Sequence, residues 1–220
     1  MRFAAVLSDL DGVLVDSGAE VERIWREWAV SRGLDPDEVG RTSHGVPGVQ
    51  VIERFAPELD AAAESERLDA EHAQTGGVAL PGAAELLASV SPLAVVTSCT
   101  PPLATARFSA AGLVPPAVVI TADLTPRGKP HPDPYLAGAR ALRVPPEDCL
   151  VIEDAPAGIA AGLAAGATVW AVTTTHAADE LAAADAVFSG LPEIVGRLRP
   201  LERTAAGQGE ASFGRLGGRA

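Results

Sequence analysis

The chain has 220 residues, enough for one large domain or a domain with a small insert. Its net charge of −12 argues against a nucleic-acid surface, because phosphate backbones require clustered Lys and Arg side chains. We expect no signal peptide and no membrane span, since no apolar stretch is long and uncharged enough. Cys99 and Cys149 make neither a zinc pattern nor a disulfide framework, so we expect buried thiols and a cytoplasmic protein.

The first third of the chain contains one predicted strand followed by helices. Residues 3–7 form a short apolar run that ends at Ser8 and Asp9, which predicts a buried strand with an acidic end. Residues 21–32 have the apolar spacing of a helix. Residues 35–74 continue with helix-like pieces and contain no good strand candidate. We therefore expect an all-helical insert of about sixty residues after the first strand.

The rest of the chain alternates between predicted strands and predicted helices. The strands are residues 93–97, 117–121, 149–152, 168–172 and, at an edge, 186–188. The helices are residues 83–89, 103–111, 133–142 and 157–165. This alternation indicates βαβ units and a parallel sheet, so the predicted fold class is α/β. The expected organisation is an α/β core of residues 1–15 and 82–200, a helical cap of residues 16–81, and a poorly ordered tail of residues 201–220.

Polar side chains stand out at the ends of the predicted apolar runs. In chain order they are Asp9 and Asp11, Thr97 and Ser98, Lys129, and Glu153 and Asp154. We expect them to converge, because open parallel sheets bind ligands at the carboxyl ends of their strands. Taken singly, each has an ordinary structural explanation, such as a solvated turn at Asp9–Gly12. Their joint occurrence in this order favours a site.

The residue types indicate phosphoryl-transfer chemistry. The carboxylates of Asp9 and Asp154 suit Mg²⁺, a hard cation that prefers oxygen ligands. One carboxylate can attack phosphorus, and Asp11 can protonate the leaving oxygen and later activate water. Thr97 can donate hydrogen bonds to the phosphoryl group, and Lys129 can balance the charge.

Four segments resemble the motifs of the haloacid dehalogenase superfamily. They are residues 8–17 (SDLDGVLVDS), 95–98 (VVTS), 128–133 (GKPHPD) and 151–159 (VIEDAPAGI), and they occur in the family's order. The resemblance implies a Rossmann-like parallel sheet core with an inserted α-helical cap domain. This arrangement agrees with the insert that the pattern of residues 16–81 predicts.

The resemblance also implies roles for the motif residues. Asp9 would be the nucleophile and Asp11 the general acid and base, and the presence of Asp11 argues against dehalogenation, because the superfamily's dehalogenases lack this second aspartate. Phosphoryl-binding roles would fall to Thr97, Ser98 and Lys129. The family's cofactor is Mg²⁺, and its ligands here would be the Asp9 carboxylate, the Asp11 backbone carbonyl and Asp154, with Glu153 in support.

Within the superfamily, the cap resembles that of the β-phosphoglucomutase-like subgroup, especially its 2-deoxyglucose-6-phosphate and glycerol-3-phosphate phosphatases. The segments that carry this likeness are residues 21–25, 43–45 and 80–82. β-Phosphoglucomutases have a histidine and a basic residue where this chain has Val21 and Gly48, which favours hydrolysis over mutase chemistry. His44 is the cap residue that we expect to touch the substrate.

The leading hypothesis is a Mg²⁺-dependent phosphatase of a small phosphomonoester, a sugar or polyol phosphate. The expected partner is this small metabolite, with no nucleic acid and no membrane, and the expected state is a monomer or weak dimer. One alternative is a sugar phosphomutase of the β-phosphoglucomutase type. A second is a signalling module phosphorylated on aspartate, although receiver domains are shorter and lack a large insert after the first strand.

Overall fold

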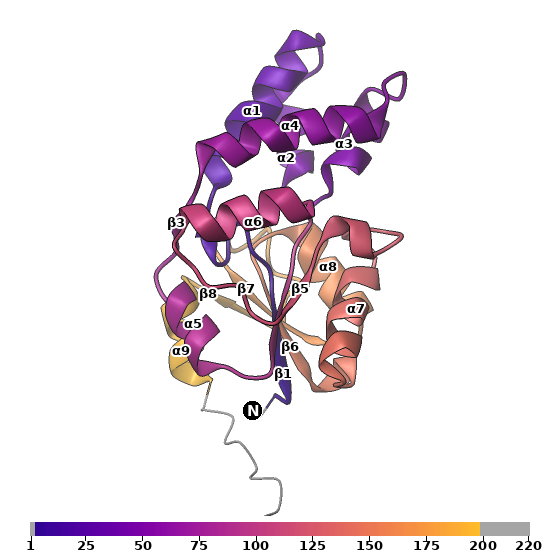
Figure 1. Cartoon of the computed structure of the whole chain (residues 1–220). Coiled ribbons are helices and arrows are strands. Elements are labelled where there is room, and N and C mark those ends of the chain that lie inside the picture. Colours follow the sequence, from indigo (N-terminus) through magenta and orange to yellow (C-terminus); the bar gives the residue numbers. More distant parts are fainter. Residues whose placement is uncertain (1–2, 199–220) are drawn as a thin grey trace, which may run out of the picture.

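A computed structural model describes residues 3–198, and in this range the core is a six-stranded parallel sheet (Figure 1). The strand order is β5-β4-β1-β6-β7-β8. The strands are β1 (Ala5–Ser8), β4 (Leu93–Val96), β5 (Val118–Ile120), β6 (Cys149–Glu153), β7 (Thr168–Val172) and β8 (Ala186–Phe188). The predicted tail of residues 201–220 lies outside the described residues.

Strand β1 lies at the centre of the sheet, where it pairs with β4 on one side and β6 on the other. Leu7 is in register with Ala94 and with Val151. All four residues of β1 are buried, because helices cover both faces of a parallel sheet. This explains why the strands read as continuous apolar runs. It also places the residue after β1, Asp9, in the middle of the sheet's edge.

Two layers of helices cover the sheet. On one face α5 (Ala83–Ser89), α6 (Pro101–Ala110) and α9 (Leu191–Arg197) pack against side chains such as Val6 and Leu150. On the other face α7 (Asp133–Leu142) and α8 (Pro156–Ala164) pack against Leu7 and Val151. Two short 3₁₀ helices, η1 (Ala122–Leu124) and η2 (Pro146–Asp148), complete this part of the chain. Successive residues of one strand thus belong to two separate apolar clusters, as the alternation of a strand requires.

Four helices form a cap beyond the carboxyl ends of the strands (Figure 1). They are α1 (Gly18–Ser31), α2 (Pro36–Ser43), α3 (Gly48–Phe55) and α4 (Ala61–Thr75). The cap has its own apolar cluster, which includes Trp25, Trp28 and Leu68. A two-stranded antiparallel ribbon of β2 (Val15–Asp16) and β3 (Val78–Ala79) joins the cap to the core at both crossings of the chain.

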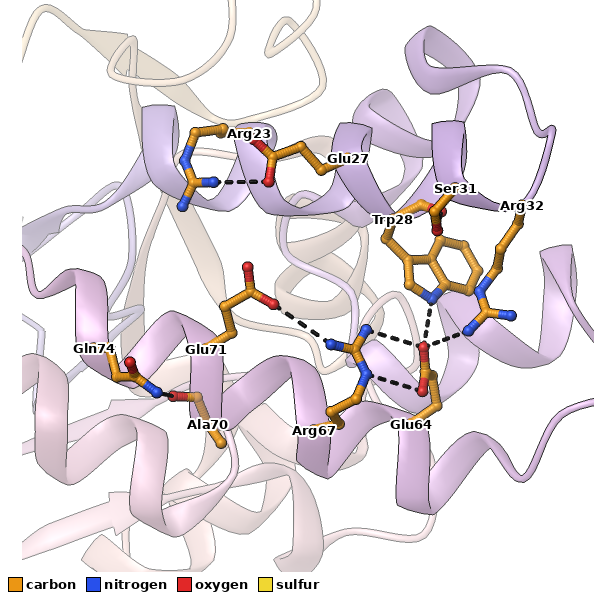
Figure 2. A network of polar contacts seen from close by, with 10 residues as sticks. All are labelled: Arg23, Glu27, Trp28, Ser31, Arg32, Glu64, Arg67, Ala70, Glu71 and Gln74. Carbon is orange, nitrogen blue, oxygen red and sulfur yellow. Dashed lines mark hydrogen bonds and ion pairs between the residues drawn. The ribbon is translucent and has the colours of Figure 1, made fainter.

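A polar network on one side of the cap links α1 to α4 (Figure 2). The Glu64 carboxylate accepts hydrogen bonds from Trp28 Nε1 at 2.9 Å and from Arg32 at 2.6 Å, both on or next to α1. Arg67, one turn along α4, donates to both oxygens of Glu64 at 3.1 Å. Glu64 is therefore the residue through which the two longest cap helices are joined by polar contacts.

The α/β fold class with a helical insert is confirmed, and most predicted elements lie within three residues of the observed ones. The pattern missed β2, β3 and α9. Two-residue strands show no periodicity, so the sequence carries no signal for the ribbon. None of the helices within residues 3–198 is long and apolar enough to cross a membrane. The domain boundaries near residues 16 and 81 stay a prediction.

Candidate active site

A pocket of about 90 Å³ lies between the carboxyl ends of the strands and the cap. The core residues that line it include Asp9, Asp11, Thr97, Ser98, Cys99, Arg107, Asp154 and Thr175. The cap residues include Val21, Trp25, His44, Val46, Asp69 and His72. The structure thus brings the predicted residues of three motifs and His44 to one pocket. The other two predicted residues, Lys129 and Glu153, lie buried next to Asp9.

Asp9 follows β1 directly, and its backbone N–H donates to the carbonyl of Ile152 at 3.0 Å. Its side chain is only 5% exposed, and its Oδ1 lies 2.9 Å from Lys129 Nζ. Burial raises the pKa of Asp9 to about 7, although the positive charge of Lys129 acts in the opposite direction. A cation bound at this carboxylate would stabilise its ionised form.

The sequence pattern groups Lys129 with the residues at strand ends. In the structure Lys129 lies in the loop between η1 and α7, and not directly after β5. It is nevertheless completely buried, and its ammonium lies 2.6 Å from Glu153 Oε1 and 3.2 Å from the carbonyl of Val96. Burial opposes the charged form, but the carboxylates of Asp9 and Glu153 raise the pKa of Lys129 above its usual value. Lys129 is thus a fixed positive charge against Asp9.

Glu153, the last residue of β6, is fully occupied by hydrogen bonds. Its Oε1 accepts from Lys129 and, at 2.5 Å, from the hydroxyl of Tyr135. Its Oε2 accepts from the backbone N–H of Asp154 at 3.0 Å and of Ala155 at 3.4 Å. A Cβ at Gly158 would lie 1.7 Å from Oε1, so the first turn of α8 must have a glycine here. Glu153 therefore orients Lys129 and the start of the following loop.

Asp154 is buried beside Asp9, and burial together with the negative charges of Glu153 and Asp9 raises its pKa well above the usual value. Its Oδ2 accepts a short hydrogen bond from Thr175 Oγ1, and its backbone carbonyl lies 3.0 Å from Nδ1 of His176. On its other side, a Cβ at Gly12 would lie 2.0 Å from Asp154 Oδ2. The loop after β1 can approach Asp154 this closely because Gly12 has no side chain and a φ of +78°.

Asp9, Glu153 and Asp154 form a buried acidic cluster that could hold a metal ion. Each offers a carboxylate oxygen, and these oxygens lie within 4.8 Å of one another. Among the described residues, a single ammonium, that of Lys129, forms ion pairs with this cluster, through Asp9 and Glu153. The excess of negative charge and the oxygen donors suit a hard divalent cation such as Mg²⁺. The residues present therefore fit the expected metal.

Asp11 lines the pocket and contacts three side chains. Its Oδ1 forms an ion pair with Arg107 Nε at 2.9 Å and accepts a short hydrogen bond from Ser17. Its Oδ2 accepts from the thiol of Cys99 at 2.9 Å. Burial, followed by the negative charge of Asp11, raises the pKa of Cys99 well above its usual value, which keeps the thiol protonated as a donor. The Asp11 carboxylate is thus held by three side chains at the pocket wall.

The cap loop after α2 closes over the core. Ser98 donates from its hydroxyl to the carbonyl of Gly45 at 2.8 Å, which joins the second motif to this loop. His44 packs edge-on against His176, with ring centroids 5.4 Å apart. Burial, with the nearby His176, lowers the pKa of His44. Thr97 accepts from the backbone N–H of Cys99 at 3.1 Å and has a hydroxyl proton available for a ligand.

Sequence reasoning missed Arg107, Tyr135 and Thr175 as parts of this site. A signal existed for Arg107, because it lies four and three residues after the apolar Leu103 and Ala104, which is the spacing of one helix face. A charged residue on an apolar face must find a partner when it is buried. Tyr135 and Thr175 gave no such signal, since their contacts with Glu153 and Asp154 depend on how the helices and loops pack.

The chain matches known proteins over most of its length. The family of haloacid dehalogenase-like hydrolases matches residues 3–166. The chain is 44% identical over 209 residues to hexitol phosphatase A of Escherichia coli (strain K12), which covers 91% of this chain and 97% of the relative. It is 34% identical over 197 residues to glycerol-1-phosphate phosphohydrolase 2 of Saccharomyces cerevisiae, with 82% and 79% covered. A hydrolase from Pseudomonas syringae of known crystal structure has a TM-score of 0.74 at 27% identity, with 88% and 96% covered.

The chain belongs to the haloacid dehalogenase-like hydrolase family. The family resemblance of the four sequence motifs is therefore confirmed. The protein is an enzyme of the hydrolase class, and its named relatives are phosphoric monoester hydrolases.

Proposed function

We propose that the protein is a Mg²⁺-dependent phosphatase that hydrolyses a small sugar or polyol phosphate through an aspartyl-phosphate on Asp9. The observation that carries the proposal is the placement of Asp9. It is a buried carboxylate in contact with Lys129, beside the second carboxylate Asp154, at the floor of a pocket under a cap. The phosphatases among the relatives support the same class of reaction.

In this proposal Asp9 and Asp154 would hold Mg²⁺ with their side chains, and Asp11 would hold it with its backbone carbonyl. Glu153 acts in support, because both of its oxygens already accept hydrogen bonds from other groups. The cation would neutralise phosphoryl oxygens, which makes attack by an anion feasible. Lys129 supplies a second, permanent positive charge next to the nucleophile.

The reaction then has two steps at the same phosphorus. A carboxylate oxygen of Asp9 forms a bond to phosphorus as the bond to the substrate's ester oxygen breaks, and Asp11 gives its proton to that oxygen. In the second step Asp11 takes a proton from a water molecule, whose oxygen bonds to phosphorus and releases Asp9 and inorganic phosphate. Thr97 and Ser98 are assigned to the phosphoryl oxygens.

Two pocket residues favour hydrolysis over transfer within one sugar. Val21 and Gly48 line the pocket at the positions where mutases of the resembled subgroup have a histidine and a basic residue. A Cβ at Gly48 would lie 2.7 Å from Ser65 Oγ and 3.5 Å from Trp25, so a side chain at this position would have to displace the Ser65 hydroxyl. The cap therefore lacks the groups that would hold a second phosphate at these positions.

The pocket size and its lining support a small, hydroxyl-rich substrate. A volume of about 90 Å³ fits a small phosphorylated molecule. His44, which sits in the cap loop over the core, is assigned to the substrate. The cytoplasmic location and the monomer or weak dimer expected from the sequence stay predictions.

Replacement of Asp9 by Asn tests the mechanism. We expect Asp9→Asn to abolish phosphate release from hexitol and glycerol phosphates in the presence of Mg²⁺, because an amide does not attack phosphorus. The matched control is Asp179→Asn, at an exposed position away from the pocket, which should keep wild-type turnover. Thermal unfolding checks that both variants are folded, and phosphate release near the wild-type rate in Asp9→Asn would refute the mechanism.

The same assays separate the alternatives. A phosphatase loses activity when a chelator removes Mg²⁺ and regains it when Mg²⁺ is added. Conversion of a sugar 1-phosphate into a 6-phosphate before free phosphate appears would indicate a mutase. Stable phosphorylation of Asp9 without turnover would indicate the signalling module.

A further inference from the structure

Arg107 is a buried arginine that no step of the proposed reaction uses. It lies on α6, and its side chain is 1% exposed. Its Nε forms the 2.9 Å ion pair with Asp11 Oδ1, and its Nη1 donates to the backbone carbonyl of Gly76 in a short hydrogen bond and to that of His72 at 3.4 Å. One guanidinium thus contacts Asp11 and the C-terminal end of the cap helix α4.

Burial of this cation needs an explanation. Moving a guanidinium out of water is costly, and an apolar side chain of similar volume would often serve stability equally well. Arg107 nevertheless makes an incomplete set of contacts, since neither Nε nor Nη2 has a hydrogen-bond partner among the described residues, and Nε meets Asp11 as an ion pair only. The partners that it does have, Asp11 and the two cap carbonyls, belong to parts of the chain far apart in sequence. Arg107 therefore connects Asp11 of the core to the end of the cap helix α4.

The two contacted carbonyls lie at the second crossing from cap to core. Gly76 ends α4 with a φ of +81°, and Gly77 precedes strand β3 of the ribbon. A Cβ at Gly77 would lie 2.5 Å from Val15 and 3.8 Å from Cδ of Arg107, so the chain crosses close to the arginine. Figure 1 shows α6 directly beneath α4 at this crossing. A shift of the end of α4 relative to the core would therefore move the carbonyls that accept hydrogen bonds from Arg107.

We propose that Arg107 is a positioning residue that couples the direction of the Asp11 carboxylate to the position of the cap. With α4 in place, the carbonyls of His72 and Gly76 accept hydrogen bonds from Nη1 of the guanidinium, and this places Nε in ion-pair contact with Asp11 Oδ1 at the pocket wall. Ser17 and Cys99 hold the same carboxylate from the segments before α1 and after β4. The inference rests on the proposed role of Asp11 as the proton donor to the leaving oxygen.

The leaving group provides a test that general structural damage does not mimic. A sugar or polyol alkoxide is strongly basic and must be protonated as it leaves, whereas acetate leaves acetyl phosphate as a stable anion. Loss of a general acid should therefore slow the hydrolysis of alkyl phosphates and leave the hydrolysis of acetyl phosphate nearly unchanged. We expect Arg107→Met to lower kcat on a hexitol phosphate about 10²-fold and on acetyl phosphate less than about threefold, with KM little changed. Arg107→Lys, which keeps the charge, should recover part of the loss.

Three comparisons complete the experiment, all on the Mg²⁺-loaded enzyme. Arg140→Met, at an exposed position on α7, should leave both substrates unaffected. Asp11→Asn should show the same selective loss on the hexitol phosphate. In the Asp11→Asn background the Arg107→Lys substitution should have no further effect on kcat, because residues that act as a unit are not additive.

Equal losses on both substrates in Arg107→Lys, or additive effects in the double variant, would overturn the inference while leaving the proposed function intact. A different result, in which Asp11→Asn slows both substrates equally, would overturn the role of Asp11 itself. Because Arg107→Lys keeps a buried cation beside Asp11, it tests the inference even if Arg107→Met does not fold.

Discussion

Gly12 shows how a single residue sets the geometry of the acidic cluster. Its φ of +78° and the 2.0 Å that would separate an added Cβ from Asp154 Oδ2 leave room for glycine alone. We expect Gly12→Ala to push the first loop away from Asp154, with loss of phosphatase activity of at least about 10²-fold, since a misplacement of 1 Å can cost this much. Phosphate release with saturating Mg²⁺ measures the effect.

Gly33 offers a matched control for backbone strain. It has a φ of +69°, but an added Cβ would meet nothing within 4 Å. Gly33→Ala should therefore cost about 1 kcal/mol of stability from the left-handed backbone and leave turnover unchanged. If Gly12→Ala were as active as Gly33→Ala, the close approach to Asp154 would not matter for the reaction.

The acidic pair at residues 9 and 11 and the acids at residues 153 and 154 were predictable as site residues. Their positions after apolar runs indicate strand ends, and parallel strands bring such ends to one edge. The sequence could not show that Lys129 is buried between Asp9 and Glu153. Lys129 follows a 3₁₀ helix in an irregular loop, and the path of such a loop depends on what it packs against.

At the level of elements, Glu64 joins helices α1 and α4 (Figure 2). Its side chain is 15% exposed, and hydrogen bonds from Arg67 first, then from Arg32 and Trp28, lower its pKa to about 2. We expect Glu64→Gln to lower the free energy of unfolding by about 1 kcal/mol, or the thermal midpoint by about 2–4 °C. A thermal melt at pH 7 measures it.

The pH dependence of this contribution has a defined sign. The folded-state pKa of Glu64 lies below its usual value of 4.5, so the stabilisation is present above pH 4.5 and is lost as the pH falls toward 2. Glu71→Gln is the control, because Glu71 is 43% exposed and its pair with Arg67 is at 3.5 Å. A midpoint for Glu64→Gln equal to that of Glu71→Gln would show that the network in Figure 2 adds no stability.

At the scale of the whole molecule, His72 lies between the cap and the core. It is on α4, is 5% exposed and lines the pocket. Burial, and then the positive charge of Arg107, lowers the pKa of His72 to about 4, so the folded protein holds it neutral. Unfolded chains bind the proton near pH 6.5, so the folded state loses stability as the pH falls from 6.5 through 4.

This predicts a pH-dependent loss of stability that substitution removes. Between pH 7 and pH 4.5 the wild type should lose about 2 kcal/mol more than His72→Gln does. Urea unfolding at both pH values measures the difference. His131→Gln, at an exposed position, should keep the wild-type dependence. Equal slopes for His72→Gln and the wild type would mean that His72 takes up its proton in the folded state as readily as in the unfolded chain.

The order of elements, the α/β class and the convergence of the motif residues followed from the sequence, because hydrophobic periodicity and the geometry of parallel strands are local rules. Tertiary structure alone decided which side chains touch. Asp11 meets Arg107, and Glu153 meets Tyr135, only after helices α6 and α7 pack on opposite faces of the sheet. Such contacts depend on how segments far apart in the sequence pack together, and the periodic pattern of apolar residues in a single sequence does not show this.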